Sequence, residues 1–435
     1  MNIKKICFAA SLMSVVMMLA SSSASAQSGT SSPYSMYGIG VLSDQSTSFS
    51  RAMSGVAQGF SDGNQVNPMN PASYGNVDSL SFIFDVGMSL LNTNLKEGNT
   101  KLNAKSANFE YAAAAFRVWK NIGCSFGVLP YTNIGYNFFN SGKETGSVED
   151  TYVNTYTGSG GLREAYLGFG WKPFKYVAFG FNAGYIWGDF SKSVTSVHSL
   201  TSASSLFRLY EGTVRTYKID LGLQTYIPMN KDNQLSLGAS YTIGHNMNNT
   251  VDVYDIKADT TSYHVKDAYF VPTTISAGLA WNYKNKLKVG ADFTLYKFAG
   301  EAFPVLEDNG TKFTFAKRVG QLLDRKRFAF GADYVPDELS RNFFCRIHYR
   351  AGAYMATPYI KVSDNQGRFV DGPKELGLSF GFGVPIINTY NNRSILNVSG
   401  QWVRTSASNM ITENYWRINI ALTFNERWFA KWKFE

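Results

Sequence analysis

Residues 377–384 read GLSFGFGV, with a large apolar residue at every second position and Gly or Ser between them. Residues 416–424, WRINIALTF, have the same period of two. Because successive side chains of a strand point to opposite faces, each stretch predicts a strand with one apolar face. Such segments recur about fourteen times from residue 80 onward. We therefore predict an all-β fold, a transmembrane antiparallel β-barrel of about 14 strands.

Residues 1–26 have the pattern of a secretory signal peptide. Lys4 and Lys5 precede an apolar run at 6–20, and the small residues of 24–26 offer a cleavage site. No other apolar stretch has the length that a spanning helix needs. The segment predicts export, and with the strands it predicts the bacterial outer membrane as the location.

The connections between the predicted strands alternate in length. Short ones lie at 120–121, 173–175, 229–233, 284–286, 336–341 and 388–393, and long polar ones at 91–105, 139–162, 189–212, 246–267, 299–326, 356–374 and 405–413. Short turns on one side and long loops on the other are typical of outer-membrane barrels. Residues 79–435 are therefore predicted to form a barrel, with a short periplasmic tail, in contact with outer-membrane lipids.

Composition and motifs argue against several other functions. The net charge is +9, but no Lys- or Arg-rich run indicates nucleic-acid binding. The four His residues have no metal-ligand spacing, and no cofactor motif is present, so we expect neither a metal nor a cofactor. G-x-S-x-G occurs at 123–127 and 377–381, but inside predicted strands rather than at the strand-to-helix turn where the motif has meaning. We predict that the protein is not an enzyme.

Residues 27–78 differ in composition from the rest of the chain. They are rich in Ser, Gly, Asn and Gln and lack alternation. They form either a disordered arm or a compact plug. A 14-stranded barrel has a lumen too wide for its own side chains to fill, so it must be open or plugged. We predict that residues 27–78 are an N-terminal hatch.

The stretch 51–74, RAMSGVAQGFSDGNQVNPMNPASY, resembles the FadL/TodX family of outer-membrane transporters for hydrophobic compounds. The matching positions are Arg51, Ala52, Gly55, Asn70, Pro71 and Ala72; Ser73 stands where members usually have Gly. The resemblance implies a 14-stranded barrel with an N-terminal hatch, and hydrophobic substrates such as fatty acids or aromatics that leave sideways through the wall. Residues 33–40 and 425–429 resemble a Bacteroidetes branch of such barrels.

For the hatch, we predict gating roles for Arg51, Gly55, Asn70, Pro71 and Ala72. Asn70 and Pro71 would tie the hatch to the wall, although Asn-Pro-Ala can also be a simple turn. The apolar residues predicted to face substrate are Phe60, Val66 and Met69.

Pro130 lies inside the third predicted strand. Proline lacks the N–H that a strand ladder needs, so the strand must form a bulge, a kink or a gap there. In the FadL/TodX family an inward kink in the third strand makes the lateral exit. We hypothesise that Gly127, Pro130 and Gly135 mark such an opening; the alternative is a bulge without functional consequence.

Alternation also assigns charged residues to the lumen, because charges on the lipid face destabilise a barrel. The lumen residues predicted in this way include Asp85, Arg346, His348, Arg350 and Arg417. They form either a salt-bridge network or a polar track for a carboxylate head group. Arg346 and Arg350 are the best candidates for carboxylate binding, since Arg pairs with carboxylates through two hydrogen bonds.

The leading hypothesis is passive uptake of small hydrophobic or amphipathic molecules past the hatch. The alternative is a non-enzymatic subunit or carrier in an envelope secretion or assembly complex. Expected partners are hydrophobic small molecules, the barrel-insertion machinery and other envelope proteins. A transporter predicts a continuous apolar tunnel past the hatch.

Overall fold

The structure, a computed structural model, describes residues 30–143, 151–199, 206–256, 260–308, 313–363, 369–389, 392–408 and 410–427. The predicted signal peptide and the residues after Arg427 lie outside this part of the chain.

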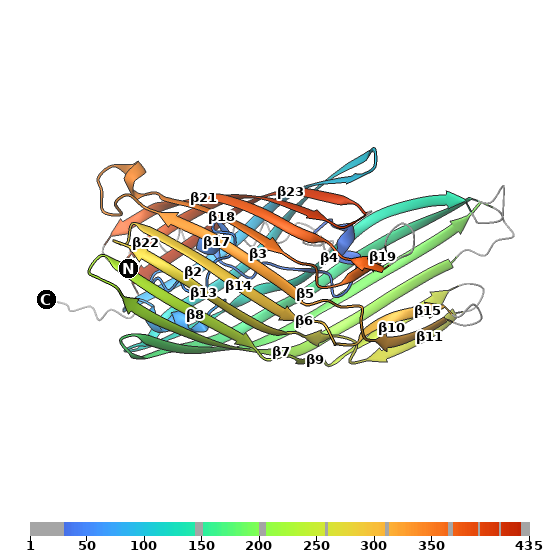
Figure 1. Ribbon diagram of the computed structural model, residues 1–435, viewed down its shortest axis with the longest axis horizontal. Coiled ribbons are helices and arrows are strands. Elements are labelled where there is room, and N and C mark those ends of the chain that lie inside the picture. The colour runs from blue at the N-terminus through green and yellow to red at the C-terminus, as the bar shows by residue number, and fades with distance from the viewer. Residues whose placement is uncertain are drawn as a thin grey trace, which may run out of the picture.

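Fourteen antiparallel strands of the described residues close into one barrel (Figure 1). They are β2 (Ser81–Glu97), β3 (Thr100–Trp119), β4 (Ile122–Lys143), β5 (Thr151–Phe174), β6 (Val177–His198), β7 (Leu206–Pro228), β8 (Asn233–Thr242), β13 (Thr273–Tyr283), β14 (Leu287–Lys297), β17 (Arg325–Tyr334), β18 (His348–Ala356), β21 (Lys374–Thr389), β22 (Asn392–Ser406) and β23 (Thr412–Arg427). Each pairs with its neighbour in this order, and β23 pairs with β2 to close the circle. The predicted fold class and strand number are confirmed.

The other elements are short. The N-terminal ones are η1 (Pro33–Met36), β1 (Val41–Leu42), α2 (Ser48–Arg51) and η2 (Pro71–Asn76). Those in the loops are β9 (His245–Asn246), β10 (Asn249–Ile256), β11 (Thr260–Lys266), β12 (Phe270–Val271), β15 (Phe303–Asp308), β16 (Phe313–Arg318), η3 (Phe343–Arg346), β19 (Lys361–Ser363) and β20 (Phe369–Asp371). Among the described residues, no helix has the length and apolar character needed to cross a membrane.

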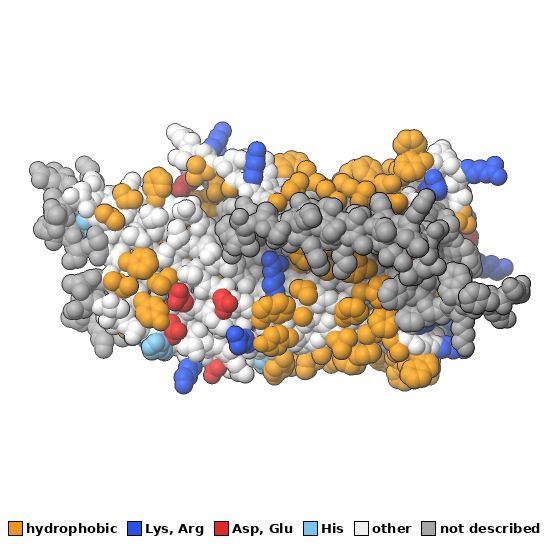
Figure 2. All heavy atoms as spheres, turned by 180° about the vertical axis from the view of Figure 1, so that it is seen from behind, with side chains coloured by type: hydrophobic (Ala, Val, Ile, Leu, Met, Phe, Trp, Pro, Cys, Tyr) orange, Lys and Arg blue, Asp and Glu red, His pale blue; other side chains and the backbone are white. Residues whose placement is uncertain are grey.

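The outer surface carries an apolar band at one end of the barrel. In β5, the outward residues Leu167, Phe169 and Trp171 are exposed, while the half of the strand before Leu162 is mostly polar. Figure 2 shows the hydrophobic side chains gathered over the half that carries the short turns. About ten residues of a tilted strand cross a bilayer, so this band matches the membrane and the rest of the wall projects beyond it.

The long links predicted at 91–105, 139–162 and 189–212 are mostly strand. β2 and β3, for example, are joined by only Gly98 and Asn99, and Gly98 has a positive φ of 55° that suits the tight turn. The reason is that the wall continues above the membrane, where its outer face meets water instead of lipid. Apolar alternation is lost there, although the strands still pair.

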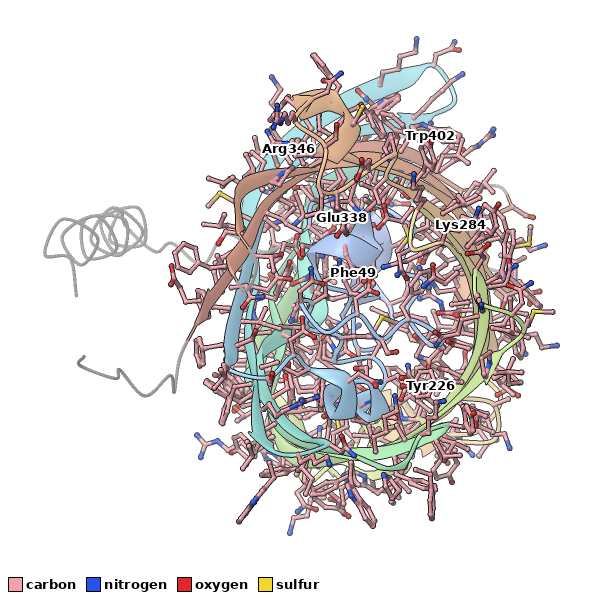
Figure 3. The ribbon with its side chains drawn as sticks, turned by 90° about the vertical axis from the view of Figure 1, so that its left-hand side faces the viewer. Phe49, Tyr226, Lys284, Glu338, Arg346 and Trp402 are labelled. Atoms are coloured by element: carbon pink, nitrogen blue, oxygen red, sulfur yellow. The ribbon has the colours of Figure 1, made fainter. Side chains whose placement is uncertain are left out.

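Residues 30–78, the N-terminal segment, lie inside the barrel. Figure 3 looks along the barrel and shows Phe49 of this segment within the ring of strands. Phe49, Met53, Val56 and Phe60 form one buried cluster with residues of the wall, among them Ala280. The segment predicted as a hatch therefore occupies the lumen.

The inner face of the wall carries glycines at many points where the backbone of the N-terminal segment touches it. A Cβ added to Gly238 would lie 1.8 Å from the carbonyl oxygen of Gln58, and one on Gly180 would lie 2.3 Å from Pro71. These inward glycines are called the glycine ring: Gly123, Gly170, Gly180, Gly222, Gly238, Gly331 and Gly352. The small residues of the alternating pattern thus admit a second layer of backbone.

This close approach predicts that Gly238→Ala displaces the N-terminal segment and lowers the stability of the barrel by about 1–3 kcal/mol, as overpacking does. Thermal unfolding of the detergent-purified protein and limited proteolysis within residues 30–78 would measure the effect. Gly400→Ala is the matched control, because no atom lies within 4 Å of a Cβ at that position. Equal behaviour of the two variants would contradict the prediction.

Candidate functional site

Arg51 joins the N-terminal segment to the wall near the middle of the lumen. It ends α2 and is 3% exposed. Its guanidinium lies 3.2 Å from Glu110 of β3 and over the Tyr111 ring, and it donates to the carbonyl oxygens of Asp44 and Ser46. Arg51 therefore fixes both the turn that precedes α2 and the position of α2 against β3.

Asn70, Pro71 and Ala72 begin η2, at the end of the lumen nearest the short turns. The Asn70 side chain accepts from Ala72 N–H, as a helix cap does, and donates to the carbonyl oxygen of Gln58. Pro71 occupies the first turn, where its missing N–H costs nothing. These residues both form a turn and bind the wall, since Asn70 also donates to the carbonyl oxygen of Leu223.

Gly55 follows α2 in a left-handed conformation, with φ of 79°. A Cβ there would lie 2.8 Å from the guanidinium of Arg327 on β17. That guanidinium donates to the carbonyl oxygen of Ser54 at 2.6 Å. Gly55 thus lets the chain turn tightly against a cation of the wall.

Two carboxylates of the wall hold the N-terminal segment. Asp85 of β2 accepts from Ser48 Oγ at 2.7 Å and from Tyr111 Oη at 3.0 Å. Asp292 of β14 accepts from the backbone N–H groups of Ala57 and Gln58 at 2.6 and 2.9 Å. Asp85 therefore serves as an anchor, as does Asp292, whose role the sequence pattern did not assign beyond an inward position.

The three apolar residues predicted to face substrate have different surroundings. Phe60 packs in the cluster with Phe49, and Val66 is fully buried against Tyr74 and the wall. Of the three, Met69 lines the internal cavity.

The lumen contains a cavity of about 210 Å³ that is partly open to solvent. Its lining mixes charged side chains with apolar ones such as Met69, Leu91 and Leu129. The charged lining residues are Asp44, Glu110, Glu164, Lys218, Asp220, Arg325, Arg327, Glu375, Glu413 and Arg417, and tyrosines such as Tyr354 and Tyr415 lie among them. The continuous apolar tunnel expected of a transporter of hydrocarbons is therefore not what lines this cavity.

The wall has a breach, defined as the place where β3 and β4 part. β3 pairs with β4 only from Trp119 to Ala112, while β4 continues to Lys143 along β5. Both strands are irregular at this point. The β2–β3 register skips Glu110, and the β4–β5 register skips Tyr131. A bulge on each strand thus turns the two edges apart.

Pro130 lies at the bulge of β4, between its last residues paired with β3 and the breach. Gly127 is still paired, opposite Ala113 of β3. Gly135 lies beyond the bulge, opposite Ser159 of β5, and its N–H donates to Ser35 Oγ at 3.0 Å. The irregularity expected at Pro130 is present, and the three residues lie along the lower end of the breach.

The N-terminal segment covers the β4 side of the breach. Val41 and Leu42 of β1 pair with Asn133 and Thr132, and Ser43 N–H donates to the carbonyl oxygen of Tyr131 at 3.0 Å. Further along, Tyr359 Oη donates to the carbonyl oxygen of Gly40. The chain itself therefore adds a short strand where β3 is missing.

The predicted polar lumen residues divide into two groups. His348 and Arg350 both bind the carboxylate of Asp333 on β17, and Arg350 Nε lies 3.2 Å from it. These three residues form a buried network. Arg417 of β23 lies 5.4 Å from the Tyr415 ring and lines the cavity. Arg350 is therefore already neutralised, and it does not line the cavity.

Arg346 lies outside the strands. The strand that contains His348 and Arg350 begins only at His348, because Asn342 caps the short helix η3 that contains Arg346. Its guanidinium lies 5.8 Å from the Phe343 ring, in the link between β17 and β18 at the rim (Figure 3). The assignment of Arg346 to the lumen by alternation was wrong, since alternation holds only within a strand.

Arg327 and Glu110 are among the cavity residues that sequence reasoning missed. Arg327 belongs to the inward set of β17 with Arg325 and Asp333, so alternation within that strand assigns it to the lumen. Glu110 sits at the bulge of β3, where the period of two is interrupted. Its inward position follows from the bulge, which the sequence alone does not reveal.

Asp44 lies in the turn before α2, near the guanidinium groups of Arg51 and Arg327. Burial alone would raise the pKa of Asp44, but the guanidinium groups of Arg51 and Arg327 hold it below its ordinary value. A carboxylate whose pKa is lowered by folding stabilises the fold above its ordinary pKa of about 3.9, and that contribution is lost as the pH falls through the lowered value.

Comparison with known proteins agrees with this architecture. The CymD monoaromatic hydrocarbon channel has a TM-score of 0.58 and 13% identity, over 90% of this chain and 100% of that chain. The toluene transporter TbuX of Ralstonia pickettii has a TM-score of 0.58 and 15% identity, over 88% and 99%. A Pseudomonas aeruginosa FadL homologue has a TM-score of 0.58 and 11% identity, over 88% and 99%. No curated protein sequence matches the chain.

The fold, the apolar band and these comparisons define the class: an outer-membrane β-barrel with the FadL/TodX fold. Within that class, the chain belongs to the BamG family, whose model matches residues 3–435. The predicted resemblance and the outer-membrane location are confirmed, while the Bacteroidetes branch stays a prediction.

Arg51→Ala is expected to leave Glu110 buried without its cation, which destabilises a fold by about 3–5 kcal/mol. The N-terminal segment should become accessible to protease at temperatures where the wild type is protected. Arg51→Lys, which keeps the charge but not the forked hydrogen bonds, should show an intermediate effect. Full protection of the Ala variant would show that the segment is held without Arg51.

The lowered pKa of Asp44 predicts that the protection of the N-terminal segment depends on pH. Between pH 7 and about pH 4 the N-terminal segment should stay protected, and below the ordinary Asp pKa its protection should decline as the carboxylate is protonated. Pulse proteolysis across this pH range measures the change. Asp44→Asn should flatten that part of the profile; an unchanged profile would assign the acid sensitivity to other groups.

Proposed function

We propose that the protein is an outer-membrane uptake barrel for small amphipathic molecules, which enter the lumen, pass the N-terminal segment and leave sideways at the breach. The observation that carries this proposal is that the internal cavity reaches the breach. Leu129, Tyr131 and Asn133 of β4 line both. A route from the lumen to the membrane therefore needs only the displacement of residues 41–43 from the edge of β4.

The charged lining narrows the substrate class. Placing a pure hydrocarbon against charged groups would desolvate them without compensation. An amphipathic carboxylate suits the lining better, because its head group can pair with a guanidinium while its chain lies along the tyrosines. Arg327 and Arg417 replace Arg346 and Arg350 as the proposed head-group ligands, since both line the cavity.

The names of the similar structures support uptake as the general function. Two of them are described as a monoaromatic hydrocarbon channel and a toluene transporter. Transport through such a channel would be passive and would use neither a cofactor nor enzymatic chemistry. The predicted gating roles of Arg51, Gly55, Asn70, Pro71 and Ala72 then become roles in holding the segment that must partly move.

A second candidate function is that of a subunit in an envelope assembly complex. The name of the BamG family points to the barrel-assembly machinery. The observation that favours it is how firmly the lumen is filled. The glycine ring holds the N-terminal segment from one side, and an aromatic cluster with Tyr269, Phe270 and Phe298 joins the outer loops to the wall.

A reversible disulfide between β1 and β4 at the breach distinguishes the uptake function from the assembly function. Leu42 and Thr132 are register partners of β1 and β4, so Leu42→Cys with Thr132→Cys can form a cross-strand disulfide, in a Cys124→Ser, Cys345→Ser background. In proteoliposomes, uptake of a fluorescent long-chain carboxylate should stop on oxidation and return on reduction.

Ser191→Cys with Glu211→Cys is the matched control, since it joins β6 and β7 in the same way away from the breach. Equal uptake in the oxidised and reduced breach variant would overturn the lateral exit. Absence of uptake in every variant, with co-purification of other envelope proteins, would favour the assembly function.

A further inference from the structure

The outward face of five neighbouring strands changes from apolar to basic at the edge of the apolar band. The strands are β21, β22, β23, β2 and β3, which pair in this order (Figure 1). On β23, the outward residues from Phe424 to Trp416 are apolar, and this span fits the roughly 9–11 residues of a strand that crosses a bilayer. Asn414 and Thr412 follow on the same face, so the apolar band ends at Trp416.

Two tryptophans mark the outer limit of the band. Trp402 of β22 and Trp416 of β23 are direct register partners, and Trp416 is 57% exposed. Tryptophan is enriched at the interface where lipid chains give way to head groups. Both tryptophans lie on the side of the long loops, which faces out of the cell in outer-membrane barrels. The head groups of the outer leaflet therefore lie at the level just above this pair.

Basic residues stand at and above the level of the tryptophans. Arg404 follows Trp402 on the outward face, about 7 Å further along β22. Asn92 of β2 is the register partner of both Trp416 and Lys105, so Lys105 lies in the same row as the tryptophans. We define the outer basic patch as the exposed, outward-facing residues Lys96, Lys101, Lys105, Lys374 and Arg404.

No carboxylate on the same face neutralises these cations. The Glu residues of the five strands above the tryptophans belong to the inward set, and three of them, Glu110, Glu375 and Glu413, line the cavity. None of the five cations makes an ion pair within the part of the chain that the structure describes. Lys96 even stands directly opposite Lys101 in the register. Like charges placed in this way repel each other, so a bound anion would stabilise the patch.

Another sector of the wall has a similar tryptophan but no excess of charge. Trp187 of β6 has Arg163 and Arg215 as its register partners on the two neighbouring strands. Asp189 follows Trp187 on the outward face, and Glu211 lies above Arg215 on β7; both acids are exposed. The unbalanced positive charge is therefore specific to the outer basic patch and is not a general property of the rim.

The outer basic patch is broad, and its centre is polar and uncharged. Arg404 and Lys105 are separated by β23 and β2, which puts them about 14 Å apart across the sheet. Between them, Asn103 donates to the side chains of Asn92 and Asn94 at 2.6 and 2.9 Å. Side-chain amides offer both donors and acceptors, which suit sugar hydroxyls. This width and this centre fit a charged sugar head group better than the smaller head group of a phospholipid.

We propose that the outer basic patch binds the phosphorylated head group of a glycolipid of the outer leaflet. The acyl chains of this glycolipid lie on the apolar band below the tryptophans, and its phosphates accept hydrogen bonds from Arg404 and the lysines. The asparagines between the cations contact the sugar. The site is independent of uptake, because it lies on the outer surface of the barrel and not in the lumen.

Native mass spectrometry of the detergent-purified protein tests this site. The probes are diphosphoryl lipid A, the same lipid A with its phosphates removed, and phosphatidylglycerol, each added at the same concentration. The expected result is a lipid A adduct that requires the phosphates and decreases as the ionic strength rises. No lipid A adduct, or an equal adduct of the dephosphorylated lipid, would overturn the proposal. An equally abundant phosphatidylglycerol adduct would also overturn it, since the site would then select charge and not a glycolipid.

Paired variants connect the adduct to the outer basic patch. Lys101→Gln with Arg404→Gln should lower the lipid A adduct about tenfold, because each cation near an anionic lipid contributes to binding. Lys101→Arg with Arg404→Lys keeps both charges and should keep the adduct. Arg163→Gln with Arg215→Gln is the matched control, since it removes the same charge beside Trp187 and should leave the adduct unchanged.

Thermal unfolding of each pair shows whether the barrel is still folded. If the first pair is not, Lys101→Gln alone replaces it, because this exposed residue lies near the tip of the β2–β3 hairpin. An adduct unaffected by loss of the patch charges, or lowered equally by the control pair, would contradict binding at the outer basic patch.

Discussion

A 14-stranded barrel is wider than its own side chains can fill, and the rest of the structure depends on how this space is occupied. The chain fills it with its own backbone, residues 30–78, placed directly on the inner face of the wall. Such contact requires the glycine ring, because any Cβ at Gly238 or Gly180 would occupy the same space as the segment. The apolar face of each strand contacts the membrane, and the face with the glycines contacts the N-terminal segment.

The second constraint is electrostatic. Backbone that lies on a wall without side chains offers N–H and carbonyl groups that must be paired in a low-dielectric interior. Asp292 accepts two of these N–H groups, and the guanidiniums of Arg51 and Arg327 bind carbonyl oxygens. Charged residues of the lumen therefore hold the segment, and some of them, Arg327 included, also line the cavity together with Arg417.

The breach arises where the regular pattern cannot continue. A bulge at Glu110 on β3 and another at Tyr131, next to Pro130 on β4, turn the two strands apart. The N-terminal segment then pairs with β4 through β1. This departure from regular pairing creates the proposed exit of the cavity.

Much of this could be predicted from the sequence. The period of two determined the strands, their number and their lipid face, since these follow from local geometry and from the cost of placing charge in lipid. Pro130 indicated the bulge, because a missing N–H is a local property. Above the membrane the pattern failed, and 91–105 was expected to be a loop, since a strand whose outer face meets water need not carry large apolar residues at every second position.

Which inward charges meet was decided only by the tertiary structure. Arg346 and Arg350 were as good as Arg327 and Arg417 by sequence, but η3 removes Arg346 from the wall and Asp333 neutralises Arg350. The pairing of Glu110 with Arg51 likewise depends on a contact between residues far apart in the chain. Alternation determines which face a side chain takes; only the closed barrel, with its lumen filled, determines the neighbour it finds there.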